Sequence, residues 1–174
     1  MHRDSGRGLD NGTEGRVLPV RSLVVHVHWS GTVVHRVRFA TTGIGGAVPL
    51  PIQRYCAGQP VDLSLFSSIA PETMGEIYAR IYRAVREIPY GKTATYGEIA
   101  QQTGTGPRVV GQAMAKNPTP LIIPCHRVVG ARGIGGFSPS VEVKESLLAM
   151  EERGVKKEWE KPAARGGAAK RGRP

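Results

Sequence analysis

Hydrophobic residues in the first third of the chain follow the alternating pattern of β-strands. Residues 23–29 and 32–39 are both rich in valine, and a Ser-Gly pair at 30–31 separates them as a two-residue turn. The pattern therefore predicts an antiparallel hairpin. A loop containing Gly and Pro follows over residues 41–51, and residues 59–65 are expected to add a further strand or an edge. The sequence thus begins with a small module that is mostly β.

The hydrophobic spacing changes to that of a helix from residue 72 onward. Apolar side chains recur every three or four residues as far as Ile88, where Pro89 follows and ends the pattern. Thr95 and Glu98 then show the spacing of a capping box, in which the two residues satisfy the first turn of a helix. A second, shorter helix is therefore predicted to begin near Tyr96.

A helix-turn-helix is predicted next. Gly-Thr-Gly at 104–106 ends the short helix, and Pro107 stands where the first turn of a following helix tolerates proline. That helix is expected to extend to Asn117, and two helices joined by a three-residue turn form the helix-turn-helix arrangement. Its small residues Gly111 and Ala113 would let a partner backbone approach closely, although a generic three-helix core would tolerate them equally well.

The last part of the chain combines an apolar run, a glycine-rich segment and a helix. Residues 121–123 are interpreted as a buried strand, and a final helix is predicted over residues 141–153, closed by Gly154. These elements divide the chain into a disordered leader, a β-rich α/β domain, a second domain and a basic disordered tail. The predicted boundaries are 1–16, 17–70, 71–158 and 159–174.

Composition narrows the class of protein. The 174 residues are 40% hydrophobic and 22% charged, which suits a soluble globular chain of one domain or two small ones. No stretch approaches the roughly 20 apolar residues that span a bilayer, and the polar start of the chain lacks the apolar region of a secretory signal. Two cysteines are too few for a disulfide framework. The expected location is therefore the reducing cytoplasm, with no membrane partner.

The balance of charge indicates a polyanionic partner. The formal net charge is +10, and most of the cations are Arg, which binds phosphates and base edges through a planar fork. Between Arg80 and Arg132 there are eight Lys or Arg residues against two acidic ones. Nucleic acid is therefore the partner that the sequence predicts first.

Cys125 is the strongest candidate for covalent chemistry. It follows the apolar run, lies between Pro124 and His126, and falls in the Arg-rich part of the chain. Neighbouring positive charge favours the thiolate, which is the nucleophilic form of cysteine. From the residue types alone, an inert buried cysteine is the alternative. Cys56 is interpreted in that second way, because it occupies a polar turn with no histidine nearby.

The residues around Cys125 carry a family resemblance. Ile-Pro-Cys-His-Arg-Val-Val at 123–129, with Asn-Pro-Thr-Pro at 117–120 before it and Gly-Ile-Gly-Gly-Phe-Ser at 133–138 after it, strongly resembles the O6-alkylguanine-DNA alkyltransferases. The resemblance covers roughly half of the chain. It includes further motifs in family order, namely PYGK at 89–92, TYGEIA at 95–100, RVVGQAM at 108–114 and KESLL at 144–148, and ends at Glu151.

This resemblance implies a DNA repair protein that acts once. The cysteine thiolate would take the alkyl group from O6 of a damaged guanine in duplex DNA and keep it, without a cofactor or metal. On this basis Cys125 is the alkyl acceptor, His126 deprotonates it through a water molecule, and Glu151 orients His126. The resemblance also implies that Asn117 braces the cysteine turn and that Tyr96 donates to N3 of the guanine. The protein is expected to act as a monomer, associated with the nucleoid through DNA.

Chemistry on a base requires that the base leave the helical stack. The resemblance implies that Arg108 enters the minor groove and occupies the vacated place, as inserted side chains do in other proteins. Phe137 stands where relatives often have Tyr, which affects the range of bulky adducts rather than the reaction. The other residues expected to contact DNA are Thr95, Tyr96, Gly111, Ala113, Lys116 and Arg127. The residues expected to line the alkylguanine pocket are Pro120, Val128, Gly135, Phe137 and Ser138.

The resemblance implies an α+β fold in which a small RNase H-like α/β domain precedes a mainly helical, winged-helix-like domain. Residues 55–63 look like the end of that first domain. If residues 30–31 form the hairpin turn, His26 faces His35 across the strands and His28 shares their side of the sheet. Three histidines in a hairpin form a polar sheet face more often than a metal site, so no metal is expected.

Three other functions compete with alkyl transfer. A non-catalytic sensor of alkylated DNA would share every DNA-binding feature, but that branch of the family replaces the acceptor cysteine, which is present here as Cys125. A helix-turn-helix regulator would normally dimerise and read a sequence in the major groove. A cysteine hydrolase could use the backbone donors of the glycine-rich segment after Cys125, although the sequence indicates no substrate pocket for it.

Overall fold

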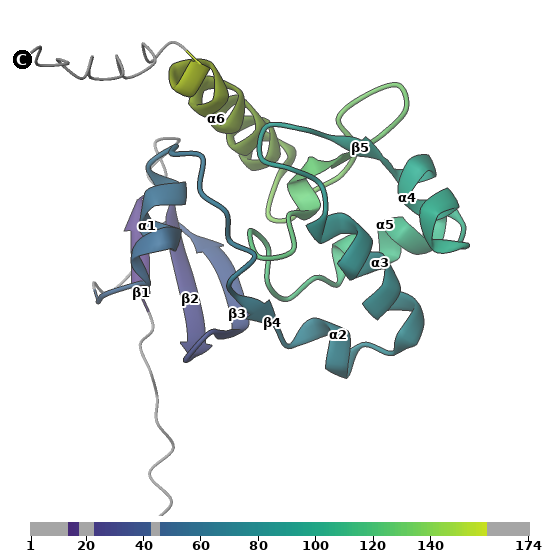
Figure 1. Cartoon of the computed structure of the whole chain (residues 1–174), viewed down its shortest axis with the longest axis horizontal. Coiled ribbons are helices and arrows are strands. Elements are labelled where there is room, and N and C mark those ends of the chain that lie inside the picture. The colour runs from purple at the N-terminus through teal and green to yellow at the C-terminus, as the bar shows by residue number, and fades with distance from the viewer. Residues whose placement is uncertain (1–13, 18–22, 43–45, 160–174) are drawn as a thin grey trace, which may run out of the picture.

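The computed structural model describes residues 14–17, 23–42 and 46–159, and Figure 1 shows a twisted sheet beside a group of helices. The mixed α+β class is confirmed. The sheet has the order β1-β2-β3-β4, with the last pair parallel and the others antiparallel. The strands of this sheet are β1 (Glu14–Val17), β2 (Val24–Ser30), β3 (Val33–Ala40) and β4 (Ser67–Ser68).

The predicted hairpin is confirmed, but its register was wrong. Ser30 pairs with Val33, so the turn consists of residues 31–32, and Gly31 adopts the left-handed φ of 57° that such a turn needs. A β-bulge between His28 and Trp29 shifts the register again. A bulge inserts one residue into a strand and therefore changes every pair beyond it.

His26 consequently does not face His35 as predicted, but His28 and His35 do share a face of the sheet, with ring centroids 5.4 Å apart. His26 lies opposite Arg38, and His28 lies opposite Arg36. His26 Nε2 is 2.9 Å from a backbone oxygen of residue 42, while His35 Nε2 is 2.7 Å from the hydroxyl of residue 30. Within the described ranges, no group of three His, Cys, Asp or Glu residues is placed to hold a metal ion.

The first module also contains a helix that the sequence pattern did not predict. Helix α1 (Leu50–Cys56) occupies the end of the expected loop, and residues 59–65 form no strand. Its two turns are too short to show a helical period, yet they bury Ile52, Tyr55 and Cys56. Cys56 is therefore a core residue and does not lie in a polar turn.

The predicted leader and tail fall mostly outside the described residues. Residues 1–13 and 160–174 are not described, but residues 14–16 belong to β1, which pairs with β2. The expectation of a disordered leader is therefore wrong for those three residues, because their backbone groups complete the sheet. Across the described chain, no helix is long and apolar enough to cross a membrane.

The helical half confirms the predicted helix-turn-helix. Helices α4 (Tyr96–Thr103) and α5 (Pro107–Ala115) are present, and the capping box between Thr95 and Glu98 forms. The long helix expected from residue 72 is divided into α2 (Ala70–Thr73) and α3 (Glu76–Arg86). These helices enclose a core that includes Tyr82, Val85, Ile99, Val110 and Ile123.

The last helix, α6 (Val141–Trp159), is longer than predicted. Gly154 was expected to close it but lies inside it, where the chain passes close to Tyr90 and Gly58. The apolar face of α6 carries Val143 and Leu147 into the core formed by the sheet and α1. The final helix in the sequence therefore packs against the first module.

Candidate active site

Cys125 lies in a tight turn rather than at the end of a strand. Residues 125–127 form the 3-10 helix η1 (Cys125–Arg127), and the preceding apolar run is not a strand, because Leu121 has a φ of 79°. The expected strand is replaced by β6 (Val128–Val129), which pairs in parallel with β5 (Ala94–Thr95). This pairing joins the cysteine turn to the start of α4, where Tyr96 follows directly.

Asn117 braces the turn, as expected. Its Nδ2 donates to the backbone oxygen of Ile123 at 2.9 Å, and its Oδ1 accepts from the backbone N–H of Thr119 at 3.0 Å. Burial raises the pKa of the Cys125 thiol to about 11, although a hydrogen bond with Asn117 and the charge of Lys144 act in the opposite direction. The resting group is therefore a neutral thiol, which needs a base before it can act as a nucleophile.

His126 is fully buried, and its two ring nitrogens differ: Nε2 takes part in hydrogen bonds, whereas Nδ1 has no partner among the described residues. Nε2 lies 2.9 Å from Oε1 of Glu151 and 3.1 Å from the hydroxyl of Tyr55. Nδ1 is buried and has no hydrogen-bond partner among the described residues. Burial lowers the pKa of His126, so the ring is neutral near pH 7. If Nε2 carries the proton toward Glu151, then Nδ1 keeps its lone pair and can accept a proton.

Glu151 accepts hydrogen bonds from several groups around His126. Burial raises its pKa, but the hydrogen bonds and charges of His126 and Arg127 outweigh that effect and hold the pKa at about 2. The backbone N–H of Gly91 donates to Oε2 at 2.9 Å, and Tyr55 donates to Oε1. Glu151 is therefore an anion fixed from several sides.

Arg127 belongs to this buried network, so the expectation that it contacts DNA is corrected. Its Nη2 donates to Glu151 Oε1 at 2.8 Å, its Nε to Oε2 at 3.0 Å, and its Nη1 to the backbone oxygen of Ile88 at 2.7 Å. A guanidinium that neutralises a buried carboxylate has no free face for a phosphate. Arg127 therefore serves the interior, whereas Arg108 and Lys116 of the same basic segment are exposed.

Lys144 is a site residue to which the sequence reasoning gave no role. Its ammonium is buried, donates to the backbone oxygens of Val128 at 2.6 Å and Gly136 at 3.2 Å, and lies 5.8 Å from the centre of the Tyr96 ring. A signal existed, because Lys144 and Glu151 are seven residues apart and therefore share one face of a helix. Charged residues on the apolar face of a helix are rarely buried without a partner.

A cavity of about 640 Å³ lies in front of Cys125. Pro120, Phe137 and Ser138 line it, as predicted for the alkylguanine pocket. It is also lined by four residues that were predicted to have other roles in the site, namely Tyr96, Gly111, Asn117 and Cys125. Val128 and Gly135 do not line it: Val128 offers its carbonyl to Lys144, and Gly135 lies against the Tyr96 ring, leaving no room for a Cβ atom.

Strand β3 supplies a wall of this cavity that the sequence did not reveal. Val37, Arg38 and Phe39 line it, and the backbone N–H of Val37 donates to the backbone oxygen of Pro118 at 2.8 Å. The rings of Phe39 and Phe137 lie 6.1 Å apart, in a tilted arrangement. The first module and the helical half therefore build the cavity together.

The remaining residues predicted to contact DNA differ in exposure. Arg108 and Lys116 are exposed, and the Lys116 ammonium lies 5.5 Å from the centre of the Tyr78 ring. Thr95 uses its hydroxyl to cap α4. Ala113 is buried, and its backbone oxygen accepts from the hydroxyl of Tyr82, so it belongs to the core and not to an exposed face.

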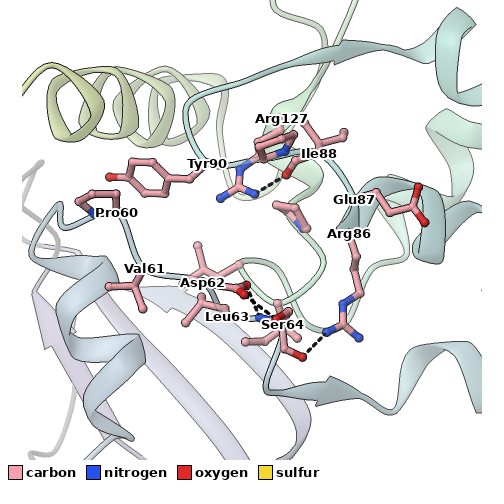
Figure 2. A pocket seen from close by; sticks show the side chains of 14 residues that line it. Pro60, Val61, Asp62, Leu63, Ser64, Arg86, Glu87, Ile88, Tyr90 and Arg127 are labelled. Atoms are coloured by element: carbon pink, nitrogen blue, oxygen red, sulfur yellow. Dashed lines mark hydrogen bonds between the residues drawn. The ribbon is translucent and has the colours of Figure 1, made fainter. Parts of the chain in front are cut away.

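A second cavity, of about 400 Å³, lies behind the cysteine turn (Figure 2). Pro124 and Arg127 line it from the turn, and residues 60–64 line it from the first module. Figure 2 shows the Arg127 side chain reaching Ile88, while Arg86 reaches the segment at Ser64. The turn that carries Cys125 thus contributes residues to both cavities.

Comparison with known proteins agrees with this geometry. Residues 76–153 match the model of the 6-O-methylguanine DNA methyltransferase DNA-binding domain. A methylated-DNA–protein-cysteine methyltransferase of Methanopyrus kandleri is 46% identical over 101 residues, which cover 58% of this chain and 75% of that protein. The chain belongs to this methyltransferase family.

Other members of the methyltransferase family show the same relationship. The protein of that name from Sulfolobus acidocaldarius is 43% identical over 97 residues, which cover 56% of this chain and 61% of the relative. A crystal structure of Mycobacterium tuberculosis OGT in complex with DNA matches with a TM-score of 0.59 and 27% identity, covering 75% of this chain and 87% of that one. The matched family model includes Cys125, His126, Lys144 and Glu151, whereas Tyr55 lies outside it.

Proposed function

We propose that this protein repairs DNA by transferring the alkyl group of O6-alkylguanine irreversibly to its own Cys125. The observation that carries the proposal is the position of Cys125 on the wall of a cavity, next to a neutral His126 that Glu151 orients from behind. The family name of the relatives supports the same chemistry.

The transfer is a direct displacement. The Cys125 proton moves to Nδ1 of His126 through a bridging water, and Glu151 stabilises the imidazolium that forms. The sulfur then forms a bond to the alkyl carbon while the bond from that carbon to O6 breaks, and the electron pair passes to the guanine. Tyr96 donates a hydrogen bond to N3 of the guanine and so favours its departure. The thioether product is stable, so each molecule acts once and needs no cofactor.

Duplex DNA would bind along the helix-turn-helix through its minor groove. Arg108 is exposed at the second position of α5, where it can enter the groove and fill the place of the extruded base. Gly111 has open space around its Cα, which suits a helix face that lies close to a nucleic-acid backbone. The Mycobacterium tuberculosis relative bound to DNA supports this choice of partner.

The cavity would hold the alkylated base. Its volume of about 640 Å³ leaves room for adducts larger than methyl, and Phe137 gives it an apolar wall. The RNase H-like and winged-helix-like descriptions, the domain boundaries, the monomeric state and the cytoplasmic location stay predictions that accompany this proposal.

The deciding experiment is mass spectrometry of the protein after incubation with an oligonucleotide that contains O6-methylguanine. We expect one added methyl group on the Cys125 peptide, saturating at one equivalent. The Cys125→Ser variant, which retains Cys56, should bind the oligonucleotide and gain no methyl group. A bound lesion with an unmodified wild-type thiol would instead indicate a non-catalytic damage sensor.

A further inference from the structure

Helix α1 of the first module places a hydroxyl group inside the active-site network. Tyr55 is fully buried, and its Oη donates to Glu151 Oε1 at 2.5 Å and lies 3.1 Å from His126 Nε2. Its ring meets those of Tyr90 and His126 edge-on, with centroid separations of 5.8 Å and 6.5 Å. Tyr55 therefore has one orientation, set by packing on several sides.

We propose that Tyr55 is a positioning residue that fixes the proton of His126 on Nε2 and leaves Nδ1 free to accept the proton of Cys125. This inference rests on the proposed alkyl transfer. It gives the first module a part in the chemistry, although Tyr55 lies outside the residues that match the family model.

The direction of the hydrogen bonds around Tyr55 determines which nitrogen of His126 carries the proton. Burial, followed by the charge of Glu151, raises the pKa of Tyr55 well above its ordinary value, so the phenol keeps its proton. Ionised carboxylates only accept, so the Tyr55 proton must point toward Glu151. The phenol oxygen then presents a lone pair to His126. Nε2 consequently faces two acceptors, Tyr55 and Glu151, and carries its proton there.

Removing the hydroxyl would loosen this arrangement without removing the ring. With Tyr55→Phe, His126 loses one of two acceptors at Nε2, and Glu151 loses one donor. The tautomer with the proton on Nδ1 then becomes accessible, and in that form His126 cannot accept the proton of Cys125. We expect the transfer rate constant to fall about tenfold, since the lost hydrogen bond involves a charged group.

The test combines a rate with a spectroscopic measurement on the full-length protein. Single-turnover transfer from O6-methylguanine DNA should slow for Tyr55→Phe, while affinity for the same DNA stays within about twofold. Nitrogen-15 NMR of the imidazole should show one tautomer in the wild type, with Nε2 protonated, and a mixture of tautomers in Tyr55→Phe. The tautomer can be measured whether or not transfer occurs, so it separates failure of this inference from failure of the proposed function.

Tyr82→Phe is the matched control. Tyr82 is equally buried, and its hydroxyl donates to the backbone oxygen of Ala113 at 2.9 Å, in the core of the helical half. It should lower the Tm but change neither the transfer rate nor the His126 tautomer. An unchanged tautomer in Tyr55→Phe, or an equal slowing in Tyr82→Phe, would overturn the assignment.

A second inference rests on the charge of the front cavity. Of the described residues that line it, Arg38 alone carries a charged side chain. Arg38 is exposed, forms no ion pair with any described residue, and follows Val37, which ties β3 to the loop at Pro118. An exposed cation on the cavity wall without an ion-pair partner among the described residues suits an anion that arrives with the substrate.

We infer that Arg38 binds the DNA phosphate next to the extruded nucleotide. Arg36 provides a control, because it is exposed on the same strand, carries the same charge and does not line the cavity. Arg38→Gln should slow transfer from duplex DNA and reduce the slope of log affinity against log salt by about 0.9. Reaction with free O6-benzylguanine, which carries no phosphate, should slow much less than transfer from duplex DNA.

Two results would overturn the second inference. Equal effects of Arg36→Gln would show that only overall charge matters. A loss confined to DNA with O6-carboxymethylguanine would mean that Arg38 reads an anionic adduct and not the phosphate. In both cases the proposed alkyl transfer itself would stand, because wild-type methylation of Cys125 is measured in the same series.

Discussion

Lys144 and Glu151 lie two turns apart on α6 and hold the turn that carries Cys125 at two places. Lys144 donates to the backbone oxygen of Val128, just after η1, and Glu151 binds His126 within η1. Both side chains are buried, so each depends on the partners that the turn provides. Together with Asn117, which braces the residues before Cys125, helix α6 therefore holds a short irregular segment in place.

The pH dependence of alkyl transfer should show a plateau. The pKa of His126 is lowered, so its neutral form persists as the pH falls until that lowered pKa is reached, while the pKa of the Cys125 thiol is about 11. Between these values the proton passes within the protein, so the rate should be flat from about pH 7 to pH 9 and should fall only when the pH drops below the ordinary histidine pKa of 6.5. Stopped-flow transfer rates check this. A tenfold rise per pH unit above pH 7 would mean that solvent, and not His126, removes the proton.

Glu151→Gln should destabilise the protein strongly. Without the carboxylate, the buried guanidinium of Arg127 has no counter-charge, and breaking such a pair costs about 3–5 kcal/mol. Urea unfolding at pH 7 measures the loss. Exposed Glu152 makes a surface ion pair with Lys156, so Glu152→Gln should leave the urea midpoint nearly unchanged.

Acid should remove part of the wild-type stability through the same residue. The pKa of Glu151 is about 2 in the folded protein, below its ordinary value of 4.5, so its contribution is present above about pH 4.5 and is lost as the pH falls toward 2. Unfolding free energies between pH 6 and pH 3 should therefore converge for wild type and Glu151→Gln. Parallel curves would contradict an ionised Glu151.

Two glycines should respond to alanine in opposite directions. A Cβ at Gly154 would lie 2.5 Å from the Tyr90 hydroxyl and 2.7 Å from the backbone oxygen of Gly58. Gly154→Ala should lower the Tm, although alanine is favoured by about 1 kcal/mol within a helix. At Gly111 a Cβ meets nothing within 4 Å, so Gly111→Ala should raise the Tm while weakening DNA binding. Calorimetry of both variants measures the change in Tm, and DNA titration measures the change in affinity.

Arg108→Ala should separate base extrusion from chemistry. Arg108 is exposed and lies outside the cavity, so its loss should not affect the reaction with free O6-benzylguanine. Transfer from duplex DNA should slow by about tenfold or more, since unstacking a base costs a few kcal/mol that an inserted side chain offsets. Equal losses on both substrates would show that Arg108 does not assist extrusion.

Local sequence signals predicted those parts of the fold whose causes are local. The capping box at Thr95 and the proline at position 107 set the starts of α4 and α5, and both helices form as expected. The hairpin was predicted too, but its turn lies one residue later than expected, and a bulge between His28 and Trp29, which no spacing rule specifies, shifts the register again. Helix α1 has only two turns, and so it left no periodic signal.

The sequence by itself determined that Cys125 is followed by His126 and lies in an Arg-rich segment that resembles a repair family. Only the tertiary structure decided what surrounds them. Tyr55 and Glu151 are 96 residues apart in the chain, yet they share a hydrogen bond, and Arg127 turns inward to complete the same network. The reason is that a buried charge must find partners wherever the fold brings them, and the order of residues along the chain does not record which distant groups become neighbours.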